Sequence, residues 1–121
     1  MSNDITQRLS GMIGLCARAR KLAVGTDIAA DAVRSGKALL LMLSFDASQN
    51  TKKKVFNCAK YYEVPCYEIP ITTADLGHCV GKLGNTAALA VLDRNMTKGI
   101  LKILNEYNQE TSKADQGSRE V

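Results

Sequence analysis

Residues 21–36 read KLAVGTDIAADAVRSG, and the order of residue types in this stretch decides the fold. The short apolar run Leu22–Val24 is typical of a strand, and it stops at Gly25. Thr26 or Asp27 suits the capping position of a following helix, and Gly36 is a residue type that commonly ends one. We expect this helix to reach about residue 35. Its predicted inward face consists of Ile28, Ala29, Ala32 and Val33.

The glycine at this junction also carries a functional hypothesis. A glycine between a strand and a helix places free backbone N–H groups at the helix N-terminus. Such an end binds anions and can reach into a nucleic-acid groove. The same arrangement is also an ordinary strand-to-helix connection without any ligand, so both interpretations stay open at this point.

The rest of the chain continues the alternation of strands and helices. Short apolar runs predict further strands at about residues 38–43, 66–69 and 86–92. Apolar residues at helical spacing predict helices at about residues 4–21, 46–62, 73–80 and 96–107. We expect Asp46 or Ser48 to cap the third helix and Thr72 or Thr73 the fourth. The predicted buried face of the third helix is Thr51, Val55, Cys58, Ala59 and Tyr62. This order predicts an α/β domain with helices on both faces of one sheet.

Length and composition place the chain among small globular proteins. A chain of 121 residues and 13.1 kDa fits one domain, which we expect to span residues 1–108. Residues 109–121 are polar and small, and we expect a disordered tail there. Neither a run long enough to span a bilayer nor a signal peptide is recognisable, so we expect a cytoplasmic protein without a membrane partner.

Positive charge is concentrated in the predicted domain. Of the 16 basic and 12 acidic side chains, 2 and 3 follow residue 108, which leaves 14 against 9 before it. A compact basic domain is consistent with a phosphate-bearing partner. Lys52, Lys53 and Lys54 occupy the first turns of a predicted helix, where the dipole disfavours cations. Either a phosphate backbone or a solvated helix face explains them, and the basic residues near Lys21 suit either RNA or the end of the first helix.

Residues with catalytic or metal-binding chemistry are sparse. Cys16, Cys58, Cys66 and Cys79 include no CxxC pair, and the single histidine is His78. The sequence has no glycine-rich nucleotide-binding motif, nucleophile elbow or HExxH motif. We therefore expect no catalytic residues, no metal and no cofactor, and we expect that the protein is not an enzyme.

The order of several short motifs resembles that of a known family, the kink-turn-binding ribosomal proteins. These are the archaeal L-seven-Ae proteins, the eukaryotic L-thirty-e proteins and their bacterial relatives. The resemblance covers about residues 5–106, and residues 14–22 look most like the bacterial branch. The motifs that carry it are KLAVGT (21–26), RSGKA (34–38), DA (46–47), VP (64–65), DLG (75–77) with Gly81, and the strand ALAVL (88–92).

The resemblance implies a three-layer α/β/α sandwich with a mixed four-stranded sheet. In the family, the second helix enters a kink-turn in RNA and its N-terminal residues read sheared G·A pairs. The loop before the fourth helix covers a base that is turned out of the stack. Carried onto this chain, and together with the lysines considered above, the candidate RNA-binding residues are Lys21, Gly25, Thr26, Asp27, Ile28, Asp31, Lys37, Lys52, Lys53, Pro70, Ile71, Thr72 and Thr73.

The reading helix departs from the family pattern, which is Gly-x-Asn-Glu followed three residues later by Lys. Gly25 is kept, but Asp27 stands for Asn, Ile28 for Glu and Asp31 for Lys. An aspartate cannot donate a hydrogen bond to guanine O6 or N7, and Asp31 would repel a phosphate. Asp27 could still accept a hydrogen bond from a guanine amino group.

Two functions follow from the sequence. The first is a monomeric, non-catalytic protein that binds structured RNA, either a kink-turn or ribosomal RNA, with no DNA partner expected. The alternative is a protein-interaction module that keeps the fold, has lost RNA reading and assists translation or ribosome assembly. The basic excess and Lys52–Lys54 favour RNA, whereas Asp27 and Asp31 favour the alternative.

Overall fold

The computed structural model describes the backbone of residues 2–114 and the side chains of residues 5–108. Helices and strands alternate along the chain, as the apolar pattern predicted. The elements are α1 (Ser2–Arg18), β1 (Leu22–Val24), α2 (Thr26–Arg34), β2 (Leu40–Ser44), α3 (Gln49–Tyr62), β3 (Cys66–Ile69), α4 (Thr73–Cys79), β4 (Ala88–Val91) and α5 (Arg94–Ala114).

The four strands form one mixed sheet in the order β1-β4-β2-β3. Strand β4 lies between β1 and β2 and is antiparallel to both, whereas β2 and β3 are parallel. The register pairs Ala23 with Ala90, and Leu41 with both Ala90 and Cys66. The predicted mixed four-stranded sheet is therefore confirmed.

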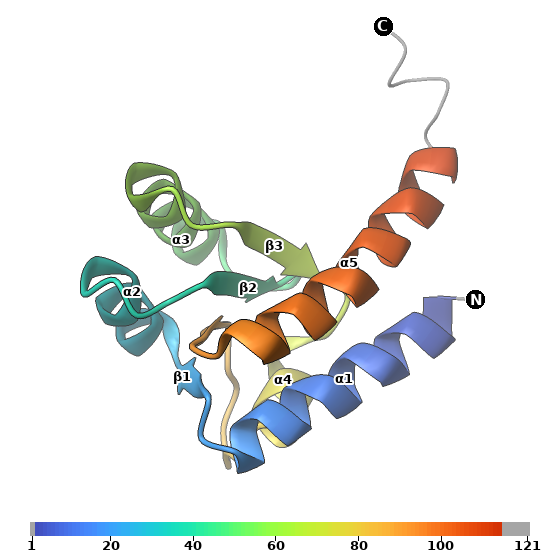
Figure 1. The fold of residues 1–121 in the computed structure, drawn as a ribbon, viewed down its shortest axis with the longest axis horizontal. Helices are drawn as coiled ribbons and strands as arrows, with labels where there is room; N and C mark the ends of the chain where they lie inside the picture. The colour runs from blue at the N-terminus through green and yellow to red at the C-terminus, as the bar shows by residue number, and fades with distance from the viewer. Residues whose placement is uncertain (1, 115–121) are drawn as a thin grey trace, which may run out of the picture.

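Two helical layers cover the two faces of the sheet, and β2 is buried on both sides because its side chains alternate between them (Figure 1). Leu40 and Met42 pack with α1, α4 and α5, which form one layer. Leu41 and Leu43 pack with α2 and α3, which form the other layer. Helices α1 and α5 run side by side in the first layer, and the ion pair between Arg8 and Glu106 joins them at 2.8 Å (Figure 1). The result is the predicted three-layer α/β/α sandwich.

Three predictions about the helices need correction. Helix α2 begins after Gly25 and has no side-chain cap, so neither Thr26 nor Asp27 caps it. Ile28 is exposed rather than inward, because the helix packs through four small or β-branched residues and Ile28 falls on the flank of that face. Tyr62 is also exposed, since it is the last residue of α3. The residues that bury α2 are Ala29, Ala30, Ala32 and Val33.

Two other caps are as predicted. The side chain of Ser48 accepts a hydrogen bond from the Thr51 N–H at 3.1 Å and so caps α3. Thr72 accepts from the Asp75 N–H at 3.0 Å and caps α4. Each cap fixes the start of a helix that follows directly after a strand, α3 after β2 and α4 after β3.

Helix α5 continues beyond residue 108, where the apolar pattern ends and where we expected the domain to stop. Its bounds are Arg94–Ala114, and Gln, Glu, Lys and Ala in this stretch are good helix formers. The expected disorder of residues 115–121 falls outside the described residues. Within residues 2–114, no helix combines the length and the apolar character needed to cross a membrane.

Candidate nucleic-acid interface

The sheet topology brings three connections to one edge. Strands β1 and β2 are both antiparallel to β4, and β3 is parallel to β2, so β1, β2 and β3 all point the same way. Their carboxyl ends therefore meet at the same edge of the sheet. We call this surface the loop edge, and it consists of residues 25–28, 45–48 and 70–73.

Hydrogen bonds join two of these connections, the one after β2 and the one after β3. The Oδ1 atom of Asp46 accepts from the Thr73 N–H at 2.8 Å and from the hydroxyl of Ser44 at 2.9 Å. The buried Ser44 hydroxyl also contacts the carbonyl oxygen of Ile71. Because Ser44 ends β2 and Asp46 follows it, while Ile71 and Thr73 follow β3, these bonds tie the loop between β3 and α4 to the end of β2.

Gly25 sets the position of α2 at this edge. Its φ of 107° and ψ of 149° lie in a region that is essentially restricted to glycine. Its N–H donates to the Ala88 carbonyl at 2.9 Å, which fixes the start of α2 against β4. The first N–H groups of a helix have no partner within the helix, and here no side chain caps them. The positive end of α2 is therefore available to an anion.

The two acidic residues of α2 are both ion-paired. Asp27 contacts the Nζ atom of Lys54 at 2.7 Å, which joins the start of α2 to α3. The hydrogen bond and charge of Lys54 lower the pKa of the Asp27 carboxyl, so Asp27 stays ionised near neutral pH. Asp31 pairs with Arg34 at 2.8 Å, one turn further along the same helix. The carboxylates that depart from the family pattern thus each have a cation of this chain as a neighbour.

The three consecutive lysines of α3 have different surroundings. Lys52 lies 3.5 Å from Glu68 of β3, and only 18% of its side chain is exposed. Lys54 faces α2 and pairs with Asp27. Lys53 lies between them, is exposed, and has no ion-pair partner among the described side chains. Of the three, Lys53 is the cation best placed to meet a phosphate.

Apolar side chains complete the loop edge. Ile28 and Phe45 are 56% and 45% exposed, so both side chains present apolar surface to the solvent. Ile71 is buried in the core, so its side chain does not reach the surface, whereas Pro70, Thr72 and Thr73 are partly exposed. A depression of about 320 Å³ lies beside this loop and is lined by Phe45, Glu68, Ile69, Pro70 and Tyr107.

The sequence did not single out Phe45 as a site residue. An apolar residue after a continuous run of buried strand residues looks like one more core position. The signal that could have distinguished it is its place directly before Asp46, at the end of a strand whose neighbours also end there.

Lys21 and Lys37 do not lie at the loop edge. The Lys21 carbonyl accepts from the Leu92 N–H at 2.9 Å, at the start of β1 and the end of β4. Lys37 follows α2 and precedes β2, and the Leu39 N–H two residues later donates to the Val91 carbonyl at 2.8 Å. Both residues therefore lie at the opposite edge of the sheet. Lys21 is separated from Gly25 by the length of β1, and Lys37 by the length of α2.

The cysteines and the histidine are spread over the molecule. Within residues 5–108, no three His, Cys, Asp or Glu side chains lie close enough together to hold a metal ion. Cys16 is buried, and Cys66 is partly buried against Cys58. Burial, with a smaller contribution from Cys58, raises the pKa of the Cys66 thiol to about 12. A thiol with such a pKa is a poor nucleophile at neutral pH.

The mixed sheet, its two helical layers and an uncapped helix at the loop edge define an α/β/α domain of the ribosomal-protein type. A family model for the Ribosomal protein L7Ae/L30e/S12e/Gadd45 family matches residues 7–100, and the chain belongs to this family. The resemblance seen in the short motifs is thereby confirmed.

Relatives with similar sequences come from bacteria and archaea. The chain is 39% identical to the RNA-binding protein YlxQ of Enterococcus faecium over 82 residues, which are 68% of this chain and 79% of that protein. It is 37% identical to the RNA-binding protein YlxQ of Bacillus subtilis over 93 residues, or 77% of this chain and 91% of that protein. It is also 29% identical to the large ribosomal subunit protein eL30 of Methanococcus vannielii over 85 residues, or 70% and 80% of the two chains. None of these names describes an enzyme.

Solved structures share the fold. A Bacillus halodurans protein of unknown function superposes with a TM-score of 0.75 at 28% identity, covering 81% of this chain and 97% of that one. The Giardia lamblia 15.5kD RNA binding protein superposes with a TM-score of 0.68 at 18% identity, covering 85% and 87% of the two chains. At this low identity the second likeness concerns the fold alone.

Proposed function

We propose that this protein binds structured RNA through the loop edge, as a non-catalytic, cytoplasmic monomer. One observation carries the proposal: the uncapped start of α2 and the loop between β3 and α4 lie at the same edge of the sheet, both hydrogen-bonded to residues 86–88, in a chain of this family. Relatives at 37% and 39% identity are RNA-binding proteins by name, which supports the same partner class here.

Each part of the loop edge, and Lys53 on the neighbouring helix α3, has a distinct role in this proposal. The N–H groups at the start of α2 donate to phosphate oxygens or to acceptor atoms of bases. Lys53 neutralises a phosphate of the strand that passes α3. Ile28 and Phe45 are exposed apolar side chains that can cover a base or a ribose. The partly exposed loop residues 70–73 cover a base that is turned out of the stack.

We propose a kink-turn or a similarly bent duplex as the RNA, bound with a modified reading helix. The Asp27 carboxylate accepts a hydrogen bond from a guanine amino group in a sheared G·A pair, where an amide would both accept and donate. The pairing of Asp27 with Lys54 reduces its repulsion of the phosphate backbone. Lys21 and Lys37 are outside this interface because they lie at the opposite edge of the sheet.

The test is a pair of titrations with a kink-turn RNA and with the same RNA carrying Watson–Crick pairs in place of its G·A pairs. We expect tighter binding of the intact kink-turn, and an affinity that falls with rising salt. Lys53→Ala should make the slope of log K against log salt shallower by about 0.7–0.9, the effect of losing one phosphate contact. Lys21→Ala removes the same charge from the opposite edge and should leave the slope unchanged.

The competing function is a protein-interaction module, and Asp27, Asp31 and the exposed Phe45 favour it. Equal, weak binding of both RNAs, with equal effects of Lys53→Ala and Lys21→Ala, would reject RNA reading at the loop edge. The protein-interaction function would then become the leading hypothesis.

A further inference from the structure

The outer face of α3 combines exposed aromatic rings with a one-sided charge. Residues 49–62 contain four lysines and no acidic residue. Phe56, Tyr61 and Tyr62 are 38%, 79% and 41% exposed, although aromatic side chains of this size usually contribute to a core. Of these residues, only Tyr62 was expected to face the interior. The three rings lie on the last two turns of the helix, where Tyr61 and Tyr62 contact each other and Phe56 lies on a different side.

These aromatic residues are not members of the buried core clusters. The buried residues of both core clusters are aliphatic, cysteine or methionine, and the described core contains no fully buried ring. The chain has six aromatic residues, and three of them are exposed residues of α3. Tyr61 and Tyr62 form an edge-to-face pair with ring centroids 4.8 Å apart and an interplanar angle of 76°. Because Tyr61 is 79% exposed, most of its ring remains accessible to a stacking partner.

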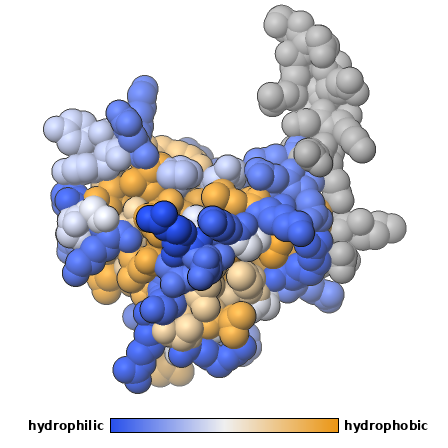
Figure 2. Space-filling view, in the orientation of Figure 1, coloured by the Kyte–Doolittle hydropathy of each residue, from blue (hydrophilic) through white to orange (hydrophobic). Residues whose placement is uncertain are grey.

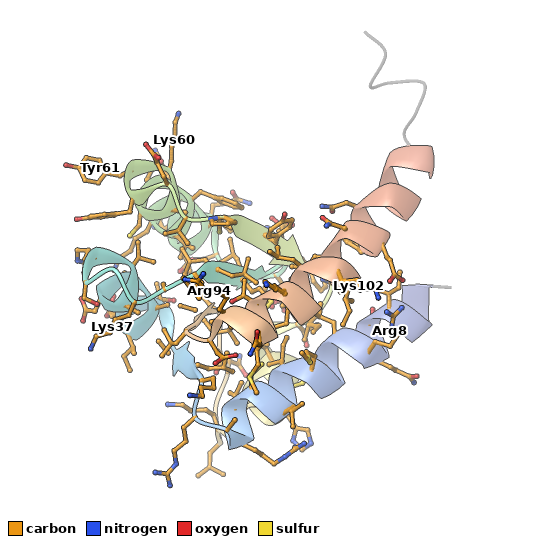
Figure 3. All side chains as sticks on the ribbon, in the orientation of Figure 1. Arg8, Lys37, Lys60, Tyr61, Arg94 and Lys102 are labelled. Atoms are coloured by element: carbon orange, nitrogen blue, oxygen red, sulfur yellow. The ribbon has the colours of Figure 1, made fainter. Side chains whose placement is uncertain are left out.

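Two cations accompany the rings. Lys53, Phe56 and Lys60 follow one another at helical spacing, so they share one side of α3. Neither Lys53 nor Lys60 has an ion-pair partner among the described side chains. Lys60 and Tyr61 both project from the outer end of α3 into solvent, away from the sheet (Figure 3). In the space-filling view, this corner carries strongly and weakly hydrophilic atoms side by side (Figure 2).

We propose that the outer face of α3 binds unpaired nucleotides of the same RNA. Bases stack on Tyr61 and its neighbouring rings, and phosphates lie near Lys53 and Lys60. Base–aromatic stacking in a basic groove is the usual chemistry by which proteins hold single-stranded nucleic acid. The face, defined as Lys53, Phe56, Lys60 and Tyr61, with Tyr62 packed against the Tyr61 ring, is called the α3 face below. This inference rests on the proposed function, because the structured part of the RNA is bound at the loop edge.

The α3 face is continuous with the loop edge. Ser48, which caps α3, is part of the loop edge, and Lys54 joins α3 to the start of α2. A helix of 14 residues is about 20 Å long, so the helix leads from the loop edge to the Tyr61 end. A strand that leaves a duplex bound at the loop edge can therefore follow α3 past Lys53 to the rings.

The charge of the α3 face favours nucleic acid over a protein partner. Protein interfaces are enriched in tyrosine and phenylalanine but depleted in lysine, and here lysines and rings alternate. Glu63 follows the helix and ends it in a left-handed conformation, with φ of 58°, but the helix itself has no carboxylate. The exposed cations complement phosphates, and the ring faces beside them complement bases.

The experiment compares a blunt kink-turn RNA with the same RNA extended by about eight unpaired uridines, placed in turn at either end. We expect the better extension to strengthen binding to the unmodified protein about five-fold or more, the equivalent of stacking one base. Tyr61→Ala should abolish this gain and leave the affinity for blunt RNA unchanged. Tyr61→Phe keeps the ring and should keep the gain. Tyr61 is 79% exposed, so neither variant should disturb folding.

The outcomes separate this inference from the proposed function. Tight binding of blunt RNA with no gain from either extension, or a gain that survives Tyr61→Ala, overturns the inference and leaves the loop edge intact. The α3 face would then be a candidate for a protein partner. If blunt RNA does not bind, the proposed function fails, and quenching of tyrosine emission by oligo-uridine decides the inference alone. The chain has four tyrosines and no tryptophan, so this emission is not masked.

Discussion

The pairing of Asp27 with Lys54 makes a specific prediction about RNA affinity. The two side chains are 2.7 Å apart, yet 83% and 55% of their surfaces are exposed. At such exposure the pair contributes little to the stability of the fold. Its main consequence is that the Lys54 ammonium group is paired with a carboxylate at the loop edge, where we propose that phosphates bind. Asp27→Asn should therefore release Lys54 to the RNA without unfolding the protein.

The size of the effect follows from one additional phosphate contact. Each contact steepens the slope of log K against log salt by about 0.7–0.9. The ratio of the Asp27→Asn affinity to the unmodified affinity should therefore fall about five- to eight-fold when salt rises ten-fold. Lowering the pH does not reproduce the substitution near neutrality, because Lys54 lowers the pKa of the Asp27 carboxyl. Asp27 loses its charge only as pH falls through that lowered pKa.

A double-mutant cycle measures the effect directly. The four proteins are the unmodified chain, Asp27→Asn, Lys54→Ala and the double variant, each titrated with the kink-turn RNA at several salt concentrations. In the unmodified chain, Lys54→Ala should weaken binding because it leaves the Asp27 carboxylate unpaired, but it should remove no phosphate contact, because Lys54 is paired with Asp27. In the Asp27→Asn background the same substitution should remove the gained slope.

Asp31→Asn is a matched control, because it removes the same charge from α2 but releases Arg34 near the other end of the helix. It should alter the slope less than Asp27→Asn does. If Asp27→Asn leaves the slope unchanged, or if the gain persists without Lys54, the start of α2 does not face a phosphate backbone and the reasoning is wrong.

Three further predictions concern affinity, packing and a thiol. Asp31→Lys should strengthen kink-turn binding several-fold at fixed salt, since it reverses a charge that is 73% exposed on the proposed reading helix; weaker binding would contradict this placement. Gly77→Ala should lower the free energy of unfolding in urea by at least about 1–3 kcal/mol, because the added methyl group would overlap the Gly84 carbonyl oxygen. Gly11→Ala meets no neighbour and should instead stabilise by about 0.5–1 kcal/mol, so equal effects of the two would refute the packing argument. Cys66, with a pKa of about 12, should resist iodoacetamide at pH 8 while folded and react in urea, because its thiolate fraction rises only as pH approaches that pKa; rapid alkylation of the folded protein would contradict its burial.

Much of the fold was predictable because, at most positions, the spacing of apolar residues is compatible with only one type of element, a helix or a strand. The bounds Cys66–Ile69 of β3 agree with the prediction, and β2 reads as a continuous apolar run because both of its faces are covered. Ile28 was assigned to the wrong side because helical spacing alone does not tell which flank of a nine-residue helix meets the sheet. Ala29 and Ala32 face the sheet instead, because their small side chains let α2 approach it closely.

The candidate site was less predictable, because its members are brought together by strand order rather than by spacing. Nothing local to Lys54 indicates that it reaches Asp27, since the two are far apart in sequence and meet only when α3 packs beside α2. Lys21 looked equivalent to Lys53 as a cation next to a motif, but the direction of β1 carries it to the opposite edge. Ile71 is a comparable case, because the loop that carries it turns its side chain into the core.

The order of the strands also determines when this chain can fold during synthesis. Within residues 2–114, strand β4 is the next-to-last element and the only strand that pairs with β1, and it also pairs with β2. Arg8 in the first helix reaches Glu106 in the last one. The N-terminal third of the protein therefore has no sheet partner until about residue 91 has left the ribosome, and contacts of such long sequence separation form slowly. The side of α1 that packs against α5 stays uncovered in the nascent chain for longer still, because α5 follows β4.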